Sequence, residues 1–288
     1  MNDFEQIDLK RKQCGNLVII GIVIIIGGAL LAYLLQSSIP VIGVVVAIIG
    51  IIVIIVGSVK FSILKKHFKN TFLRDLISKT FDNAQYYPTR GMDKKTVYDT
   101  NLVKKADRYS SEDLITGSID GVDFETCDLK LEERHVRHTK NGTQVYYVTY
   151  FLGRFFEFEF PKEFKSKIIV TEGMISTWFS KFKKIELESV EFNKKFKTYT
   201  LNEHDAFYVL TPHLMESILE LKRVNPGTLA LAFTGKKLNI AINNNRNTFE
   251  ISMFKKIDTN TITQLVRDLN VIKDIVIELK LNRNIFTN

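Results

Sequence analysis

Two long apolar runs near the start of the chain form its strongest pattern. Leu17–Leu35 and Val41–Val59 contain no charged residue, and the polar break Gln36–Pro40 separates them. As helices, each run would extend roughly 28 Å, close to the hydrocarbon thickness of a bilayer. A cleaved signal peptide is a poor explanation, because the first run is long and a second run follows directly. The pattern predicts a transmembrane helical hairpin over residues 17–59.

Small residues recur at helical spacing in both runs, so that each set falls on one stripe of its helix. Helices in lipid associate by close backbone packing, which small residues allow. We therefore expect these positions to form the contact between the two helices, or a surface for lateral self-association. The set comprises Gly21, Gly28 and Ala32 in the first run, and Gly43, Ala47, Gly50 and Gly57 in the second.

Basic residues flank the hairpin at both of its outer ends, whereas the turn between the runs has no charge. The positive-inside rule then places both termini in the cytoplasm. We expect the basic residues after the second run to face the anionic membrane surface. Lys10, Arg11 and Lys12 precede the hairpin, and Lys60, Lys65, Lys66, Lys69 and Arg74 follow it.

The regions outside the hairpin divide into three parts. Residues 1–16 form a short polar segment, for which we expect a mobile cytoplasmic tail. In residues 60–83, apolar residues recur every three to five positions from Phe61 onwards, which predicts a juxtamembrane amphipathic helix. This helix would lie on the lipid surface or connect to the domain that follows. Residues 84–288 then form a soluble domain.

Beyond residue 110 the pattern is mainly that of strands with a few helices. Asp120-Gly121 between two alternating runs is the signal of a type I′ hairpin turn. A long apolar stripe over 260–281 predicts a terminal helix packed across a sheet. The order of elements predicts an α+β fold with a mostly antiparallel sheet and packed helices. Further strands are expected at 143–152, 155–160, 167–170, 185–200, 229–234, 238–242 and 248–254, and helices at 175–182, 203–210 and 212–222.

The charge of the chain is concentrated after the hairpin. Basic and acidic residues balance in residues 1–59, so the net charge of +8 falls on residues 60–288. Lysine predominates over arginine, which suits diffuse attraction to an anionic bilayer better than the reading of nucleic-acid bases. The two cysteines, Cys14 and Cys127, exclude a disulfide scaffold.

The sequence offers little catalytic chemistry. It contains no H-E-x-x-H, C-x-x-C, P-loop or G-x-S-x-G pattern. His135 and His138 precede the Asn141-Gly142 turn, and a solvated hairpin tip explains them better than a metal site. Glu203-His204-Asp205 lies at a predicted helix start, where acidic residues favour the helix dipole. We therefore assign no catalytic residue, metal ligand or cofactor.

Two stretches carry a resemblance to a known family. Asp107–Val122 (DRYSSEDLITGSIDGV) and Leu187–Pro212 (LESVEFNKKFKTYTLNEHDAFYVLTP) resemble the bacterial domain-of-unknown-function family 3137. The likeness extends over most of residues 60–288. It implies a membrane protein with one or two spans before a soluble domain, and it supplies no reaction, cofactor or catalytic residue. It also implies a LemA-like membrane protein as a weak candidate partner.

These observations predict a membrane-anchored protein whose cytoplasmic domain is a binding module for a protein partner or for the anionic membrane surface. The alternative is a membrane-tethered enzyme with an unrecognised active site. A clustered polar pocket with perturbed pKa values would favour the enzyme, and an exposed apolar or basic surface would favour the binding module. A transporter is disfavoured, because the predicted spans contain no ionisable residue to line a path.

Overall fold

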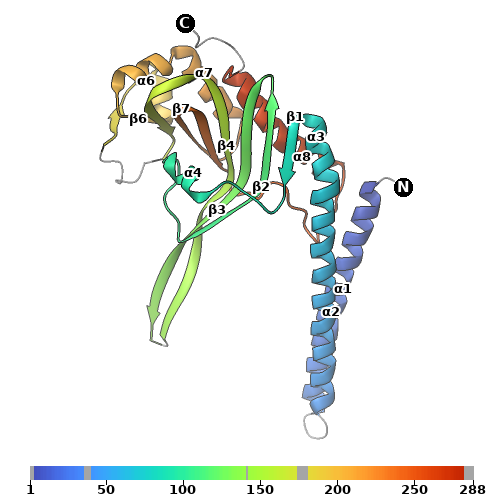
Figure 1. The fold of residues 1–288 in the computed structure, drawn as a ribbon. Helices are drawn as coiled ribbons and strands as arrows, with labels where there is room; N and C mark the ends of the chain where they lie inside the picture. Colours follow the sequence, from blue (N-terminus) through green and yellow to red (C-terminus); the bar gives the residue numbers. More distant parts are fainter. Residues whose placement is uncertain (1–2, 36–39, 141, 174–180, 282–288) are drawn as a thin grey trace. The chain divides into compact units, whose positions relative to one another are not determined.

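The computed structural model describes residues 3–35, 40–140, 142–173 and 181–281. It divides the chain into two compact units (Figure 1). The helical unit comprises residues 1–75 and 249–266, and the sheet unit comprises residues 76–248 and 267–288. The sequence-based expectation of an α+β fold with two apolar N-terminal helices before a mostly antiparallel sheet is confirmed.

Two long helices dominate the helical unit. Helix α1 (Asp3–Leu34) and helix α2 (Pro40–His67) each contain an apolar segment long enough to cross a membrane, and little of either segment is buried. Residues 36–39 of the predicted turn lie outside the described residues. Apolar side chains point outwards along both helices, including Val23, Ile26, Ile51 and Ile55.

The two helices meet along their small residues. A Cβ atom added to Gly21 would lie 2.7 Å from the carbonyl oxygen of Gly50, and one added to Gly28 would lie 2.6 Å from the backbone nitrogen of Ala47. No atom of the described part of the chain lies within 4 Å of such a Cβ at Gly27, the neighbour of Gly28. The two backbones are therefore in direct contact along the stripe that contains Gly21 and Gly28, and Gly27 lies outside this contact.

The polar start of α1 is tied to other residues of the helical unit. Residues 3–16 of the segment expected as an N-terminal tail are helical, because α1 begins at Asp3. Arg11 forms an ion pair with Asp8 (2.8 Å) and donates to the carbonyl oxygen of Met253 (2.6 Å). Asp8 in turn accepts from the backbone N–H of Ile257 (2.8 Å). These contacts hold the start of α1 to the segment that precedes helix α8.

The expected juxtamembrane helix continues α2 without a break. A π-helical turn, η1 (Phe68–Leu73), follows α2, and α3 (Arg74–Thr80) follows η1. Strand β1 (Asp82–Tyr87) and helix α4 (Lys94–Asp99) then follow.

Among the residues that the structure describes, seven antiparallel strands form the sheet of the sheet unit. They follow the order β1-β2-β3-β4-β6-β5, and β7 pairs with β4 on its other side. The Asp120-Gly121 turn is confirmed, since both residues have positive φ (51° and 80°) as a type I′ turn requires. The remaining strands are β2 (Arg108–Ile119), β3 (Val122–Thr139), β4 (Gly142–Thr171), β5 (Lys183–Ile185), β6 (Lys197–Thr200) and β7 (Thr228–Asn243).

Strand β4 is the centre of this sheet. It is one continuous strand where the sequence predicts three, so Gly153 and Pro161 do not interrupt it. Gly153 instead permits close pairing with β7, because a Cβ there would collide with the carbonyl oxygen of Ile242. Strand β7 is likewise one strand rather than a hairpin at Gly235-Lys236, since Gly235 pairs opposite Phe164 at an irregularity of the register.

Helices complete the sheet unit, and some elements differ from those predicted from the sequence. Residues 185–200 form α5 (Val190–Lys195) between β5 and β6 instead of one strand, and residues 248–254 form no strand. The expected helices near 203 and 212 are α6 (Glu203–Val209) and α7 (Pro212–Val224), and the Thr211 hydroxyl accepts from Leu214 at the start of α7. The helix expected at 175–182 falls largely on residues 174–180, outside the described residues.

The long C-terminal helix α8 (Thr259–Glu278) is confirmed, and its second half belongs to the sheet unit. It runs behind the strands in Figure 1. Leu269, Ile272 and Val276 on its apolar stripe are almost completely buried, whereas Ile277 is exposed. The large buried phenylalanines of β4, Phe155, Phe156 and Phe158, form part of the core of this unit.

Candidate functional site

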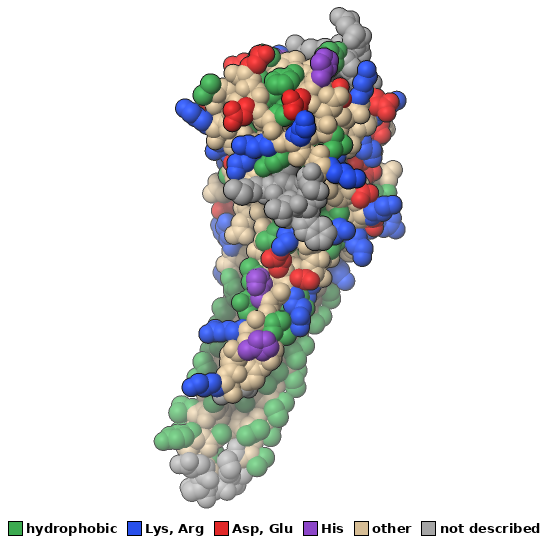
Figure 2. All heavy atoms as spheres, turned by 90° about the vertical axis from the view of Figure 1, so that its left-hand side faces the viewer, with side chains coloured by type: hydrophobic (Ala, Val, Ile, Leu, Met, Phe, Trp, Pro, Cys, Tyr) green, Lys and Arg blue, Asp and Glu red, His purple; other side chains and the backbone are tan. Residues whose placement is uncertain are grey.

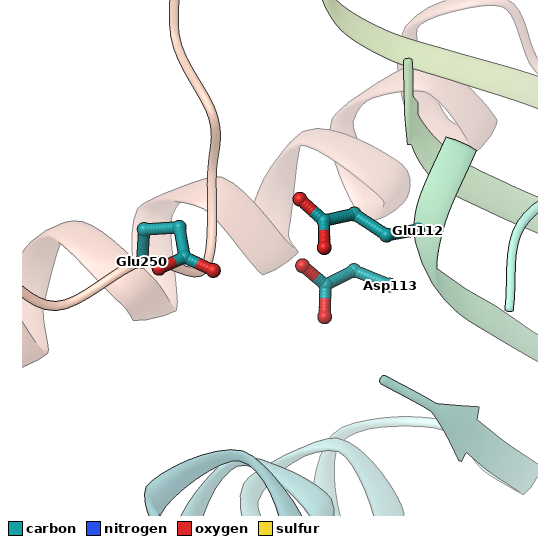
Figure 3. Close-up of side chains that lie close together, drawn as sticks. All are labelled: Glu112, Asp113 and Glu250. Atoms are coloured by element: carbon teal, nitrogen blue, oxygen red, sulfur yellow. The ribbon is translucent and has the colours of Figure 1, made fainter. Parts of the chain in front are cut away.

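A bulge in strand β2 shapes the polar centre of the sheet unit. The β2–β3 register moves from Glu112 opposite Asp128 to Ile115 opposite Thr126, so one extra residue is accommodated between the two pairs. Asp113 in this bulge has a positive φ of 57° and is completely buried. Its carboxylate accepts a hydrogen bond from the Tyr86 hydroxyl. Figure 3 shows Glu112 and Asp113 side by side at the bulge, and Glu250, also drawn there, belongs to the helical unit.

An ion pair lies buried beside this bulge. Asp128 on β3 and Arg154 on β4 are directly opposite in the register, and each side chain is only 4% exposed. The distance of 3.6 Å from Arg154 Nε to Asp128 Oδ1 is too long for a hydrogen bond. Arg154 donates instead to the Thr126 hydroxyl (3.1 Å) and to the backbone carbonyl oxygen of Asp268 on α8 (2.9 Å). One guanidinium therefore connects two strands and a helix.

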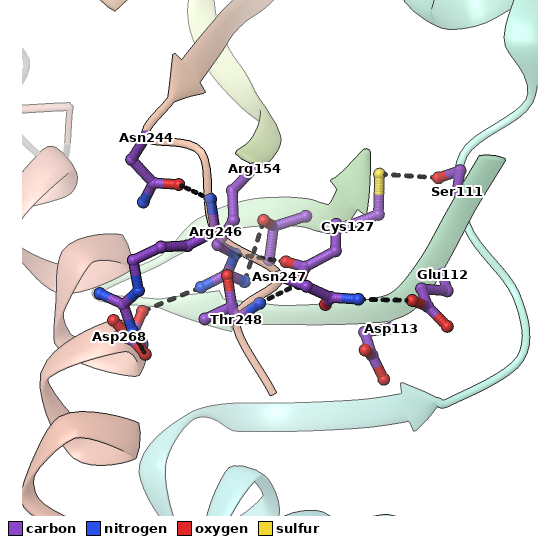
Figure 4. Close-up of polar contacts among 12 residues, drawn as sticks. Ser111, Glu112, Asp113, Cys127, Arg154, Asn244, Arg246, Asn247, Thr248 and Asp268 are labelled. Atoms are coloured by element: carbon purple, nitrogen blue, oxygen red, sulfur yellow. Dashed lines mark hydrogen bonds and ion pairs between the residues drawn. The ribbon is translucent and has the colours of Figure 1, made fainter. Parts of the chain in front are cut away.

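The segment after β7 closes over the ion pair (Figure 4). The backbone N–H of Thr248 donates to the Asp128 carboxylate, and the Asn247 amide donates to Glu112 (2.9 Å). Arg246 donates to the Asp268 carboxylate (3.2 Å). Residues far apart in the sequence thus form one polar cluster, which comprises Glu112, Asp113, Thr126, Asp128, Arg154, Arg246, Asn247, Thr248 and Asp268.

Burial changes the protonation chemistry of this cluster. Desolvation raises the pKa of the Asp128 carboxyl to about 7, although the positive charge of Arg154 and the hydrogen bond from Thr248 act in the opposite direction. Desolvation also lowers the pKa of Arg154. The pKa of the neighbouring Cys127 thiol is raised to about 11, again by burial, so this thiol stays protonated and is a poor nucleophile.

A surface pocket of about 720 Å³ opens beside the cluster. Its wall is mostly polar and combines hydroxyl, carboxylate, amide and ammonium groups with a few apolar side chains. The Tyr109 hydroxyl in this wall donates to the carbonyl oxygen of Met92 (2.9 Å). The residues that carry the polar groups are Thr89, Tyr109, Ser110, Ser111, Glu112, Asp128, Lys130 and Asn247.

The sequence motifs did not predict this cluster, and neither Asp128, Arg154 nor Asp268 was singled out. The available signal was the placement of Arg154 between apolar residues on both sides in Phe151–Phe156, since a lone charge in a strand buried on both faces needs a partner.

The second candidate site is a protruding arm. Residues 133–139 of β3 pair only with residues 142–148 of β4, beyond the point where β2 and β7 pair with them. We call residues 133–140 and 142–148 the β3–β4 arm, which extends away from the rest of the sheet as a two-stranded ribbon (Figure 1). Figure 2 shows basic (blue) and histidine (purple) side chains along it. Val136, Val145, Tyr146 and Val148 are each more than 40% exposed.

The predicted histidine positions agree with this arrangement. His135 and His138 lie on the arm, as expected of a solvated hairpin, and a spacing of three residues places them on opposite faces of the strand. His135 stacks on Tyr146 with the ring centroids 5.4 Å apart. His204 lies at the start of α6, where the Asn202 side chain accepts from its backbone N–H (3.0 Å).

The lysines predicted to face the membrane surface differ in burial and in ion pairing. Lys65 and Lys69 both form ion pairs with Glu250, the second at 2.7 Å, and Lys69 is buried. Lys60 and Lys66 are exposed, as is Arg74. Neutralisation of Lys69 would therefore disturb contacts within the helical unit, and Lys60 and Lys66 are the better probes of a membrane surface.

We expect the buried Asp128 to give the protein a specific pH dependence. Its folded pKa of about 7 lies above that of an unfolded aspartate, so its contribution to stability is complete below about pH 4 and is lost as the pH rises to about 7. Thermal unfolding of the detergent-solubilised full chain should show this loss in the wild type and not in Asp128→Asn. The exposed Asp123→Asn on the same strand is the control. Equal pH profiles for the wild type and Asp128→Asn would contradict the assignment.

Comparison with known proteins gives a family match over part of the chain and no activity. Residues 149–281 match the family model described as "Protein of unknown function (DUF3137)". This confirms the resemblance over that range, which contains the Leu187–Pro212 motif, whereas Asp107–Val122 and the β3–β4 arm precede it. No curated protein matches the chain. The crystal structure of the mycobacterial trehalose monomycolate transport factor A, TtfA, is similar at 8% identity and a TM-score of 0.37, over 75% of this chain and 95% of that one.

Proposed function

We propose that this chain, whose residues 149–281 match a family of unknown function, is a membrane-anchored binding module. Helices α1 and α2 form the anchor, and the sheet unit carries the binding surface. The observation that carries this proposal is the combination of two apolar helices with outward-facing isoleucine and valine side chains and a protruding arm with exposed apolar residues. Large exposed apolar surfaces of these two kinds mark lipid contact and partner contact, respectively.

The packing of α1 against α2 supports the anchor. Their small residues allow close backbone contact, which is the main source of helix association in lipid, and their large side chains remain available to the acyl chains. Lys10 and Lys12 at the start of α1, and Lys60 and Lys66 near the end of α2, are exposed. By the positive-inside rule, this charge distribution favours cytoplasmic placement of both ends in a bacterial inner membrane.

The arm supports the binding role. A two-stranded ribbon without further strands is only marginally stable in water, so a protruding one is a natural contact element. Its backbone edges are unpaired by other strands among the described residues, and its exposed valines and Tyr146 offer apolar contacts. The partner classes are the membrane surface, a second copy of the chain, and a membrane protein such as a LemA-like one.

The polar pocket supports a second candidate, a membrane-tethered enzyme. Asp128 lines the pocket and has a pKa near 7, which is the range that suits a general acid or base. The pocket offers no activated nucleophile, since the pKa of the adjacent Cys127 thiol is raised. This candidate would be favoured by a ligand whose binding to the full chain releases or takes up a proton near pH 7 and is lost in Asp128→Asn.

We expect photo-crosslinking to separate the binding module from the enzyme. A photoreactive phenylalanine analogue at Tyr146 on the arm should crosslink to lipid or protein in intact membranes. The same analogue at Phe207 on α6, an aromatic of similar exposure (46% against 48%), should not. Alkaline carbonate washing should leave the full chain in the membrane fraction. Extraction by carbonate would refute the anchor, and equal crosslinking at the two positions would refute the arm as the binding surface.

A further inference from the structure

We propose that the β3–β4 arm docks on the headgroup layer of an anionic bilayer. This inference rests on the proposed function, because the anchor is what keeps the sheet unit at a membrane. It names lipid phosphate as the partner of the arm. The evidence comes from the charge, the side-chain arrangement and the backbone edges of the arm.

The charged residues of the arm beyond its base are all basic. Residues 134–148 contain Arg134, Arg137 and Lys140 and no acidic residue. All three basic residues are exposed, and Glu133 at the base of the arm pairs with Lys104. A basic surface of this kind is attracted to anionic lipid. A basic partner, including a second copy of the arm, would be repelled by it, because like charges repel.

The side chains of the arm combine basic and amphipathic groups on both faces. Residues paired across the two strands share a face, so Arg134 and Val136 lie with Val145 on one face, and Arg137 lies with Tyr146 on the other. Tyrosine and arginine are suited to the boundary between headgroups and acyl chains. Tyr147 is already covered by the guanidinium of Arg108, which leaves Tyr146 as the exposed tyrosine of the arm.

The backbone of the arm limits how deeply it can enter the bilayer. Both edges of the ribbon present N–H and C=O groups that no other strand pairs among the described residues. Such edges are excluded from hydrocarbon, where nothing satisfies them, but phosphate oxygens and water in the headgroup layer can accept from the N–H groups. The arm therefore docks in the headgroup layer and does not insert across it.

The test uses the full chain in proteoliposomes of phosphatidylcholine with or without phosphatidylglycerol. A polarity-sensitive fluorophore is attached at Val145→Cys, which is exposed, whereas the native Cys14 and Cys127 are buried. We expect a blue-shifted emission and protection from an aqueous quencher only in the anionic vesicles, and reversal of both by high salt.

The charge requirement is tested by a matched pair of triple variants. Arg134→Ser, Arg137→Ser and Lys140→Ser together should weaken docking about 100-fold, at about 1 kcal/mol per basic residue near the surface and 1.4 kcal/mol per tenfold change. Lys94→Ser, Lys95→Ser and Lys105→Ser remove the same charge from exposed positions of the sheet unit outside the arm, and should leave docking unchanged.

Three results would overturn the lipid assignment. The first is a probe that stays accessible in anionic vesicles while the protein remains anchored, which would leave the proposed function intact. The second is an equal effect of the two triple variants. The third is protection in native membranes but not in protein-free anionic vesicles, which would identify a protein partner for the arm. Loss of the protein from the vesicles would instead refute the anchor.

Discussion

Replacement of Arg154 by methionine is expected to lower the free energy of unfolding by about 3–5 kcal/mol at pH 8. The substitution removes the guanidinium opposite Asp128 while the carboxyl stays almost completely buried. It also removes donors to Thr126 and to the carbonyl oxygen of Asp268. For a domain of this size, the loss corresponds to a fall in melting temperature of roughly 10 °C.

The effect should depend on pH and on Asp128. At pH 5 the Asp128 carboxyl is already protonated, because its pKa is about 7, so Arg154→Met should cost less there than at pH 8. The double variant Arg154→Met/Asp128→Leu should regain most of the loss, since an apolar pair of similar volume replaces the buried charges. Melting of the full chain in detergent at both pH values measures this. A loss that is independent of pH and is not rescued would contradict a role of Arg154 as counter-ion.

Replacement of Gly28 by isoleucine is expected to separate α1 from α2, whereas the same change at Gly27 is expected to be tolerated. A Cβ at Gly28 would lie 2.6 Å from a backbone atom of α2, so the helices must move apart, and overpacking of this kind costs about 1–3 kcal/mol or more. Gly27 faces open space in the same helix. The two variants therefore have the same composition and nearly the same helix propensity and differ in packing.

Spin labels can measure this separation directly. Val23→Cys and Ile52→Cys place labels at exposed positions, one on each helix. Dipolar broadening between them in reconstituted vesicles should remain in Gly27→Ile and disappear in Gly28→Ile. Broadening that persists equally in both variants would show that the small-residue stripe does not hold the helices together.

The parts of the fold that follow from local chemistry were predictable. Asp120-Gly121 specifies its turn because few residue pairs tolerate positive φ at both positions, and the apolar stripe of α8 specifies a packed helix. The two apolar helices follow from length and lack of charge. In each case a short stretch of sequence determines the local structure, and tertiary contacts do not alter it.

The length of β4 was not predictable in the same way. Gly153 and Pro161 commonly end strands, and here the partner strands decide the outcome. Gly153 makes room for the carbonyl of Ile242, β3 pairs on both sides of Gly153, and β7 pairs on both sides of Pro161. The buried cluster escaped prediction for a related reason. Asp128 lies in an ordinary-looking charged stretch, and only the register of β3 against β4 places it opposite Arg154.

The continuity of β4 also has a mechanical consequence. A force that pulls the tip of the β3–β4 arm away from its partner strand opens the paired residues one after another, as a zipper does. A force along the axis of β4 instead loads its bonds to β3, β6 and β7 together, in shear. The same strand is therefore compliant at its first residues and stiff at its last. Tension applied at the tip opens the pairs of the arm before the force reaches the buried Arg154.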